Sequence, residues 1–305
     1  MLFRSQNTAA TSTTSATGSI LEFSTGASGA ATAVSTLSVV GTTSLQFLAT
    51  DALGNIYTTS QSSKTSAINE YAAGSTNDAP STRSIPFNTT SGLTSLSALS
   101  VSPAGNIYAS NSSGSTSMFS STATGSVAPS SSVSISSNAG PQATAVDSTG
   151  NLYIATAPPT NSTAIAPVVV FAAGAATPSR SIAGSLTTMV DGSPKALATD
   201  TAGNLYVANV VSGVSSILVF GPTAAGNTPP LRDITGSNTS LGCVGGIALD
   251  GEGYLYVVSS ATCGSSANPS VLKFSTTGDG NIAPVSSFTA TSWTTADSAL
   301  SIAVY

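Results

Sequence analysis

The chain has 305 residues, of which 40% are hydrophobic but only 6% charged, and its net charge is −5. A soluble domain ordinarily carries roughly 25% charged residues, so Ser, Thr, Asn and Gly must supply the solvated surface here. The seven basic residues are scattered singly, which argues against a nucleic-acid partner. The lack of histidine excludes a Ser-His-Asp triad, a histidine base and His-ligated zinc.

The first five residues have the sequence of a translated sequencing adapter, and the first predicted strands follow them. Met1 to Ser5 match the translation of ATG CTC TTC CGA TCT, the end of a widely used sequencing adapter. We therefore expect authentic sequence to begin near Gln6, in a metagenomic fragment whose true N-terminus and signal peptide are missing; a real start codon is the alternative. The runs Ile20–Phe23 and the one around Leu37 are the first clear strands. No run of about 20 apolar residues predicts a transmembrane segment.

From residue 48 the chain repeats a strand, a tight turn and a second strand. The five copies end in tyrosines 45 to 53 residues apart and span residues 48–57, 99–108, 145–153, 197–206 and 247–256. In each turn we expect an aspartate to accept hydrogen bonds from turn amides and a glycine to adopt positive φ. These structural turn residues are Asp51, Asp147, Asp200 and Asp250, with Gly54, Gly105, Gly150, Gly203 and Gly253.

Two further apolar runs follow each hairpin. The third run ends in an aromatic residue, and the fourth is centred about fourteen residues later, after a proline that suits the loop entering an edge strand. The aromatic residues are Tyr71, Phe119, Phe171, Phe220 and Phe274. No segment has helical periodicity, so the unit is four antiparallel strands, A to D, which is the content of one propeller blade.

The C-terminal segment, residues 299–305, has the pattern of a strand A with no strand B, C or D after it. We expect it to pair with the N-terminal strands, because that pairing closes a ring and covers both exposed edges. The sequence therefore predicts one all-β domain over residues 1–305. The predicted fold is a six-bladed β-propeller of four-stranded antiparallel blades, with one blade split between residues 1–40 and 296–305.

The repeat also resembles a known family. The pattern Asp-x-x-Gly-Asn-Leu-Tyr, then a Val-Phe strand, then Pro-x-Arg-x-Ile-x-Gly is similar to NHL-type propeller repeats and their bacterial relatives, with the best copies of the last element at Pro178–Gly184 and Pro230–Gly236. The resemblance covers almost the whole chain. It implies a propeller and leaves function open, because such propellers serve as binding platforms, lyases, lactonases and RNA-binding domains.

Candidate binding residues lie in the connections from strand D to the next strand A. In propellers these connections share one face with the B–C loops, and that face usually carries the ligand. Gln46, Gln142, Lys195 and Asp297 approach inner strands there, and Trp293 offers a stacking surface. The alternatives are ordinary solvated loop residues and, for Trp293, a space filler between blades.

The repeated aspartates could instead be calcium ligands, as in propeller lactonases. Ser102 replaces the aspartate in the second copy, which fits a turn better than a ring of metal ligands. Arg83, Arg180 and Arg232 share one repeat position, which predicts a structural role such as tying an edge strand to a carboxylate. We expect no catalytic residue, metal or cofactor.

Cys243 and Cys263 are the only cysteines. The turn at Asp250–Gly253 sets the hairpin register and places residue 243 opposite about residue 260. A short excursion of the loop would bring Cys263 within disulfide reach. A bridge favours a periplasmic, secreted or cell-surface location; two unpaired buried thiols are the alternative.

Three functions remain open. The first is a non-enzymatic, monomeric, extracytoplasmic binding or scaffold propeller that recognises a carbohydrate, a peptide or a protein. The second is a metal-dependent lyase or lactonase with carboxylate and amide ligands, which requires such side chains to converge at the channel mouth. The third is a structural segment of a larger surface adhesin, which flanking modules would reveal.

Overall fold

The computed structural model describes residues 2–8, 17–39, 44–61, 65–135, 140–156, 167–189, 192–260, 269–291 and 301–305, with only the backbone for residues 2–8, 17, 44 and 192. The described residues are strands and turns, apart from the short 3-10 turns η1 (Ser185–Thr187) and η2 (Ser237–Thr239). None of the described segments is a helix with the length and apolar character needed to span a membrane.

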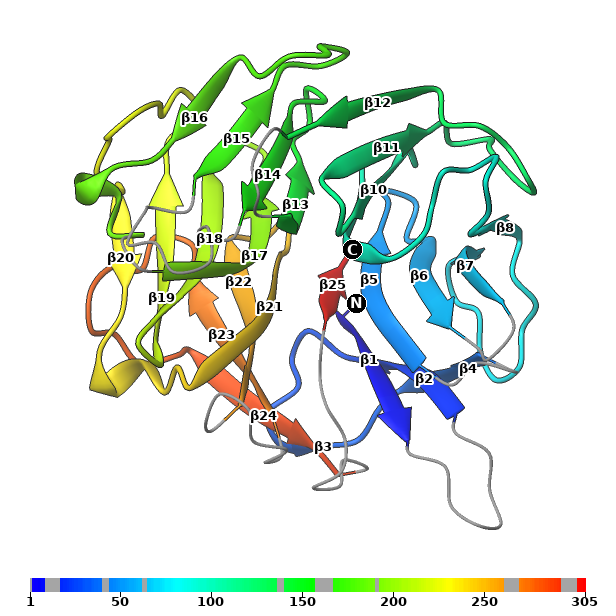
Figure 1. Ribbon diagram of the computed structural model, residues 1–305. Coiled ribbons are helices and arrows are strands. Elements are labelled where there is room, and N and C mark those ends of the chain that lie inside the picture. Colours follow the sequence, from blue (N-terminus) through cyan, green and yellow to red (C-terminus); the bar gives the residue numbers. More distant parts are fainter. Residues whose placement is uncertain are drawn as a thin grey trace.

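The strands form sheets arranged around a central axis (Figure 1). One sheet joins the chain ends in the order β25 (Ile302–Val304), β1 (Leu2–Thr8), β2 (Thr17–Phe23) and β4 (Ser35–Val39). The next two are β5 (Ser44–Thr50), β6 (Ile56–Gln61), β7 (Ser66–Tyr71) and β8 (Arg83–Pro86), then β9 (Leu96–Val101), β10 (Ile107–Asn111), β11 (Ser115–Phe119) and β12 (Ser131–Ser134).

The chain continues in the same manner around the ring. The following sheets are β13 (Pro141–Val146), β14 (Leu152–Thr156), β15 (Val168–Phe171) and β16 (Arg180–Ile182), then β17 (Gly192–Thr199), β18 (Leu205–Val211), β19 (Val214–Phe220) and β20 (Arg232–Ile234). The remaining sheet contains β21 (Cys243–Leu249), β22 (Tyr254–Ser260), β23 (Ser270–Ser275), β24 (Ser286–Ala290) and β3 (Gly29–Ala31). We call each sheet a blade and name it by its strands.

The structure corrects the predicted set of six four-stranded antiparallel blades. Five sheets are four-stranded and antiparallel, not six. The remaining sheet has a fifth strand, β3, which pairs in parallel with β24 through Phe288 and Gly29. Sequence periodicity gave no sign of β3, because it is a three-residue piece of a C–D loop whose partner lies some 260 residues away and is reached only when the ring closes.

Closure itself joins the two ends of the chain. Strand β25 pairs with β1 in an antiparallel register that places Leu2 opposite Val304. The innermost strands β25, β5, β9, β13, β17 and β21 each pack on the next around the ring. Residues 2–4 take part in this pairing; the adapter origin of residues 1–5 stays a prediction.

The hydrophobic core lies between neighbouring blades, where each sheet presents alternate side chains to the next. Aromatic residues from strands B and C are almost completely buried there. They are Tyr57, Tyr153, Tyr206, Tyr256, Phe23, Phe119, Phe171, Phe220 and Phe274. The repeated tyrosine and phenylalanine of the sequence pattern are therefore the residues that fill the space between blades.

The turn aspartates organise one recurring polar network. Asp147 Oδ1 accepts hydrogen bonds from the backbone N–H groups of Thr149 and Asn151, and its Oδ2 accepts from the Tyr153 hydroxyl at 3.2 Å. Arg180 then donates to the same hydroxyl and to the carbonyls of Pro222 and Ala224 in the next blade. The network thus connects turn, strand B, strand D and the neighbouring blade.

The arginines differ in what they bind. Arg83 forms an ion pair with Glu70 in its own blade and also donates to the Tyr57 hydroxyl. Arg180 and Arg232 likewise donate to tyrosine hydroxyls, and Arg180 donates to backbone carbonyls, as Arg83 also does. Among the bonds that the structure describes, only Arg83 has the expected carboxylate partner.

Neighbouring blades are also linked through their backbones. The residue six positions after the strand-C aromatic donates its N–H to strand D of the preceding blade: Gly125 to the Ser84 carbonyl at 2.7 Å and Gly226 to the Ser181 carbonyl at 2.7 Å. Both glycines have positive φ, which a side chain would disfavour. We call this contact the latch; Asn77, Gly280 and, through β3, Gly29 occupy the same place at other interfaces.

Candidate binding site at the mouth of the central channel

A β-bulge recurs in the inner strands and positions the side chains at the channel mouth. The register of β13 skips a residue between Pro141 and Ala143, and that of β17 skips one between Pro194 and Ala196. The unpaired residues are Gln142 and Lys195, and Gly245 is their equivalent in β21. A bulge re-aims the side chain of its extra residue, and in β13, β17 and β21 the extra residue lies at the rim of one cavity.

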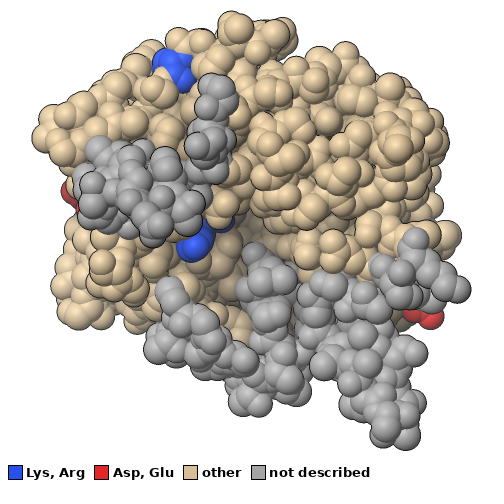
Figure 2. Space-filling model, viewed as in Figure 1, with Lys and Arg blue, Asp and Glu red and all other residues tan. Residues whose placement is uncertain are grey.

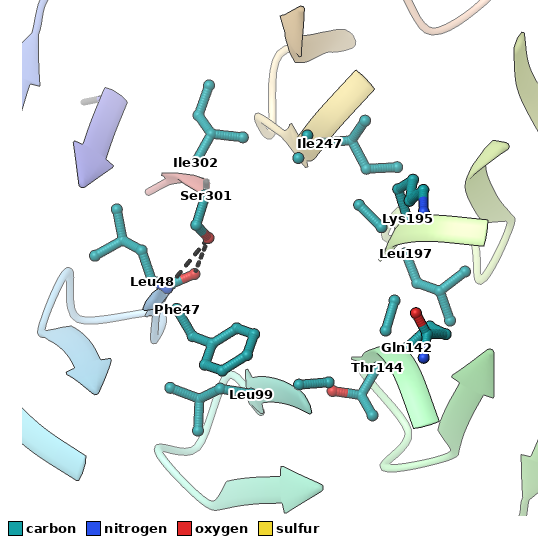
Figure 3. Close-up of a pocket in the computed structure, with 15 residues that line it drawn as sticks. Phe47, Leu48, Leu99, Gln142, Thr144, Lys195, Leu197, Ile247, Ser301 and Ile302 are labelled. Atoms are coloured by element: carbon teal, nitrogen blue, oxygen red, sulfur yellow. Dashed lines mark hydrogen bonds between the residues drawn. The ribbon is translucent and has the colours of Figure 1, made fainter. Parts of the chain in front are cut away.

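The lumen below this rim is lined by the residue that follows each bulge. These residues are mostly small: Ala98, Ala143, Ala196, Gly246 and Ser301 line it, together with the larger Phe47. Figure 3 shows the phenyl ring of Phe47 reaching into the opening, with Gln142 and Lys195 on the opposite side of the opening. The cavity at this mouth has a volume of about 120 Å³. We call it the channel mouth.

Hydroxyl groups complete the lining. The Ser301 hydroxyl accepts from the Leu48 N–H at 3.1 Å and donates to the Leu48 carbonyl at 3.2 Å, which fixes β25 against β5 (Figure 3). Thr144 is buried, and its hydroxyl has no hydrogen-bond partner in the structure. An unsatisfied buried hydroxyl costs roughly 1–3 kcal/mol.

The channel mouth is polar without being acidic. Its lining contains one cation, Lys195, one amide, Gln142, and no carboxylate among the described residues. The described part of the chain also contains no group of three or more His, Cys, Asp or Glu side chains that could hold a metal ion. Figure 2 shows a face with few charged atoms, where basic atoms border the hollow near its middle.

The structure brings together two of the five predicted binding residues. Gln142 and Lys195 are both exposed at the channel mouth. Gln46 also lies at a bulge, but its amide donates to Gln61 at 3.4 Å and it does not line the cavity. Trp293 and Asp297 lie outside the described residues.

Phe47 and Ser301 were missed by the sequence interpretation. Each immediately precedes the strand-A residue that packs between blades, Leu48 or Ile302, so strand alternation could have placed both in the lumen. The irregular register of β5 could not have been found in this way, because it interrupts that alternation between Leu45 and Leu48.

The predicted register around Cys243 agrees with the structure, which pairs Cys243 with Ser260 across β21 and β22. Cys263 lies outside the described residues, so the disulfide stays a prediction.

The comparisons with known proteins define a fold class. The chain is similar to a protein of unknown function from Bacteroides caccae, with a TM-score of 0.60, 12% identity and 98% of each chain covered. It is also similar to a protein from Lactobacillus plantarum, with a TM-score of 0.57 and 14% identity over 94% of this chain and 82% of that one. No family model and no curated protein matches the sequence. The chain is thus a β-propeller by fold, and nothing narrower follows from these likenesses.

Proposed function

We propose that this protein is a non-enzymatic binding propeller of the NHL-like kind, monomeric and extracytoplasmic, whose ligand site is the channel mouth. Its ligand is a carbohydrate, peptide or protein segment that carries an anionic group next to an apolar one. The observation that supports this proposal is that Gln142 and Lys195 line one side of the opening and Phe47 lines the other (Figure 3).

Each of these groups has a defined part in the proposed site. Lys195 is the cation that would meet a carboxylate, and Gln142 on the neighbouring strand offers both a donor and an acceptor. The Phe47 ring supplies an apolar surface for a sugar face or a side chain. At about 120 Å³ the channel mouth is smaller than the ~300–1,000 Å³ of a drug-sized pocket. It therefore suits the tip of a larger ligand.

A binding screen tests this function. Purified protein is applied to peptide and oligosaccharide arrays, and the hits are measured by calorimetry with the variants Lys195→Met and Phe47→Ala. We expect each variant to weaken binding about tenfold or more, since each removes a contact worth ~1–3 kcal/mol. Ser97→Ala is the matched control, because Ser97 occupies the bulge position in β9 but does not line the channel mouth. Hits that bind all variants equally would place the ligand elsewhere.

The extracytoplasmic location rests on the cysteine pair. A bridge between Cys243 and Cys263 would close a loop of about 20 residues and contribute on the order of 3 kcal/mol. Alkylation of the native, oxidised protein without reductant, followed by mass measurement, should add no label. Two labelled thiols would remove the reason for an oxidising compartment.

A further inference from the structure

The interface between the β9–β12 and β13–β16 blades lacks the latch that holds the other interfaces. Thr177 occupies the place of Gly125, Gly226 and Gly280, and it does not have positive φ. By equivalence the latch would use the Ser132 carbonyl and the Ser134 N–H on β12. No described residue of the next blade bonds to either group. The outer edge of β12 is therefore open.

The same interface also lacks the repeated cation. Ser131 lies opposite Met118, at the register position where Arg83 lies opposite Glu70 and Arg180 opposite Val170. Ser102 replaces the turn aspartate in this blade. As a result, the Tyr108 hydroxyl has no hydrogen-bond partner among the described residues, whereas the equivalent Tyr153 hydroxyl has both an aspartate and an arginine.

The β21–β24 blade shows that a cation is retained where the arginine alone has changed. Ser286 stands in the arginine position there, but Lys273, directly opposite on β23, takes over. Its Nζ lies 3.8 Å from the centroid of the Tyr254 ring, and it donates to the Thr25 carbonyl in the adjoining blade at 3.4 Å. The β9–β12 blade has no cation at either position.

Two cavities lie beside β12, where these contacts are missing. Strand β12 is at the top of Figure 1. The first, of about 70 Å³, is lined by Tyr108, Met118 and Ser131 and by the loop from Ala172 to Ala176. One water needs only ~10–15 Å³. The second, of about 500 Å³, is lined by Ser134 and Ile135 on one side and by Pro178 and Arg180 on the other. Together we call them the interblade groove.

We propose that the interblade groove binds an extended, arginine-bearing segment of a partner polypeptide. Its guanidinium takes the place that Arg83 and Arg180 fill at their own interfaces, with the Tyr108 hydroxyl and the carbonyls of the 172–175 loop as acceptors. These are the acceptor types that Arg180 uses at the next interface. The planar fork of arginine matches them better than lysine does. The backbone of the segment adds to the open edge of β12.

Titration of the full chain with three probes tests the ligand: acetyl-Val-Arg-Val-amide, its neutral citrulline analogue and free L-arginine. Tyrosine NMR signals and calorimetry provide the readout. We expect the arginine peptide to bind with a Kd on the order of 1 mM, and the citrulline peptide at least about tenfold more weakly. Equal binding of the two peptides, or no binding, would overturn the proposal. Free arginine binding as tightly as the peptide would overturn the polypeptide part of it.

Variants test whether the arginine peptide binds in the interblade groove. Ser131→Arg puts the missing guanidinium into the interblade groove, so it should abolish peptide binding and leave the melting temperature unchanged or higher. Ser286→Arg, at the same repeat position beside Lys273, is the matched control and should bind like the wild type. A folded Ser131→Arg protein that still binds the peptide would refute the site. Lys195→Met should leave this binding intact, which separates the interblade groove from the channel mouth.

Discussion

At the scale of single residues, the tyrosine near the start of strand B in the repeated hairpins can be compared in two environments. Tyr153 gives its hydroxyl to Asp147 and receives a bond from Arg180, whereas the Tyr108 hydroxyl has neither partner among the described residues. We expect Tyr153→Phe to lower the free energy of unfolding by about 1–3 kcal/mol, because it removes the hydrogen bonds of this hydroxyl to the charged groups of Asp147 and Arg180. Tyr108→Phe should cost less than about 0.5 kcal/mol. Urea denaturation of both variants measures the difference, and equal losses would contradict it.

The carboxylate of Asp147 makes stability depend on pH. Burial favours its neutral form, but hydrogen bonds from Asn151 and Thr149 outweigh burial and hold the pKa of Asp147 below its ordinary value. Its contribution is therefore complete above the unfolded pKa of ~3.9 and is lost as pH falls through the lower folded pKa. Asp147→Asn should lower the unfolding free energy at neutral pH by about 1–2 kcal/mol relative to the wild type. As the pH falls, the unfolding free energy of the variant should decrease less than that of the wild type. Denaturant midpoints across acidic pH provide the measurement.

The pKa of Asp233 is shifted in the opposite direction to that of Asp147. Burial and the nearby charge of Asp279 raise the pKa of Asp233, and its Oδ1 has no hydrogen-bond partner in the structure. A raised folded pKa means that the ionised group destabilises the fold at neutral pH and that acidification through that pKa relieves the penalty. Asp233→Asn should therefore increase the unfolding free energy at pH 7. A decrease would show that the carboxylate is stabilised by a contact not seen here.

At the scale of elements, the latch between blades depends on one backbone conformation. Gly226 has a φ of 61°, and a Cβ built on it would meet no atom within 4 Å, so Gly226→Ala changes only the cost of that conformation. We expect a loss of about 1–2 kcal/mol in unfolding free energy. Thr177→Ala is the matched control, because this loop makes no latch to β12, and its effect should be near zero. The proposed role of the latch fails if the two losses are alike in urea denaturation.

At the scale of the whole molecule, ring closure relies on a very short strand. Ile302 and Ala303 are buried in β25 between the neighbouring inner strands, and Thr50 donates to the Val304 carbonyl at 2.9 Å. Deleting residues 302–305 removes this strand and exposes the edge of β1. We expect the unfolding free energy to fall by at least about 3 kcal/mol, from lost burial of Ile302 and its neighbours, and the protein to self-associate through the open edge.

Deleting Tyr305 alone is the control for this truncation. Tyr305 is 44% exposed, and its removal leaves the pairing of Leu2 with Val304 in place. Its ring lies against Gly54, so its removal should cost some stability but much less than the longer deletion, and the elution position on size exclusion should stay the same. If the longer deletion were equally harmless, pairing between β25 and β1 would contribute little to the ring.

The sequence by itself determined the strands, their order and the residues between blades, because these depend on local chemistry. Alternating apolar residues, the Asp and Gly of the hairpin turn and the aromatic end of strand C act over a few positions and recur in every blade. The same repetition exposed the substitution Ser102, whereas Ser131 and Thr177 stood out only when the strand register and the contacts between blades were compared. The closing pair β25 and β1 could be anticipated as well, since an unpaired strand at each end calls for a partner.

Tertiary structure alone decided the contacts between segments far apart in the chain. The parallel pairing of β3 with β24 arises when the ring brings a C–D loop beside an edge strand. The bulges that place Gln142 and Lys195 at the channel mouth are visible only in the strand register, and Gln46 turns to Gln61 although it belongs to the same repeat position. The cavity beside Tyr108 lies where two blades meet without the arginine that Arg83 and Arg180 provide at their interfaces. A repeat pattern specifies each blade, whereas the packing of one blade on the next determines which surfaces remain open to a partner.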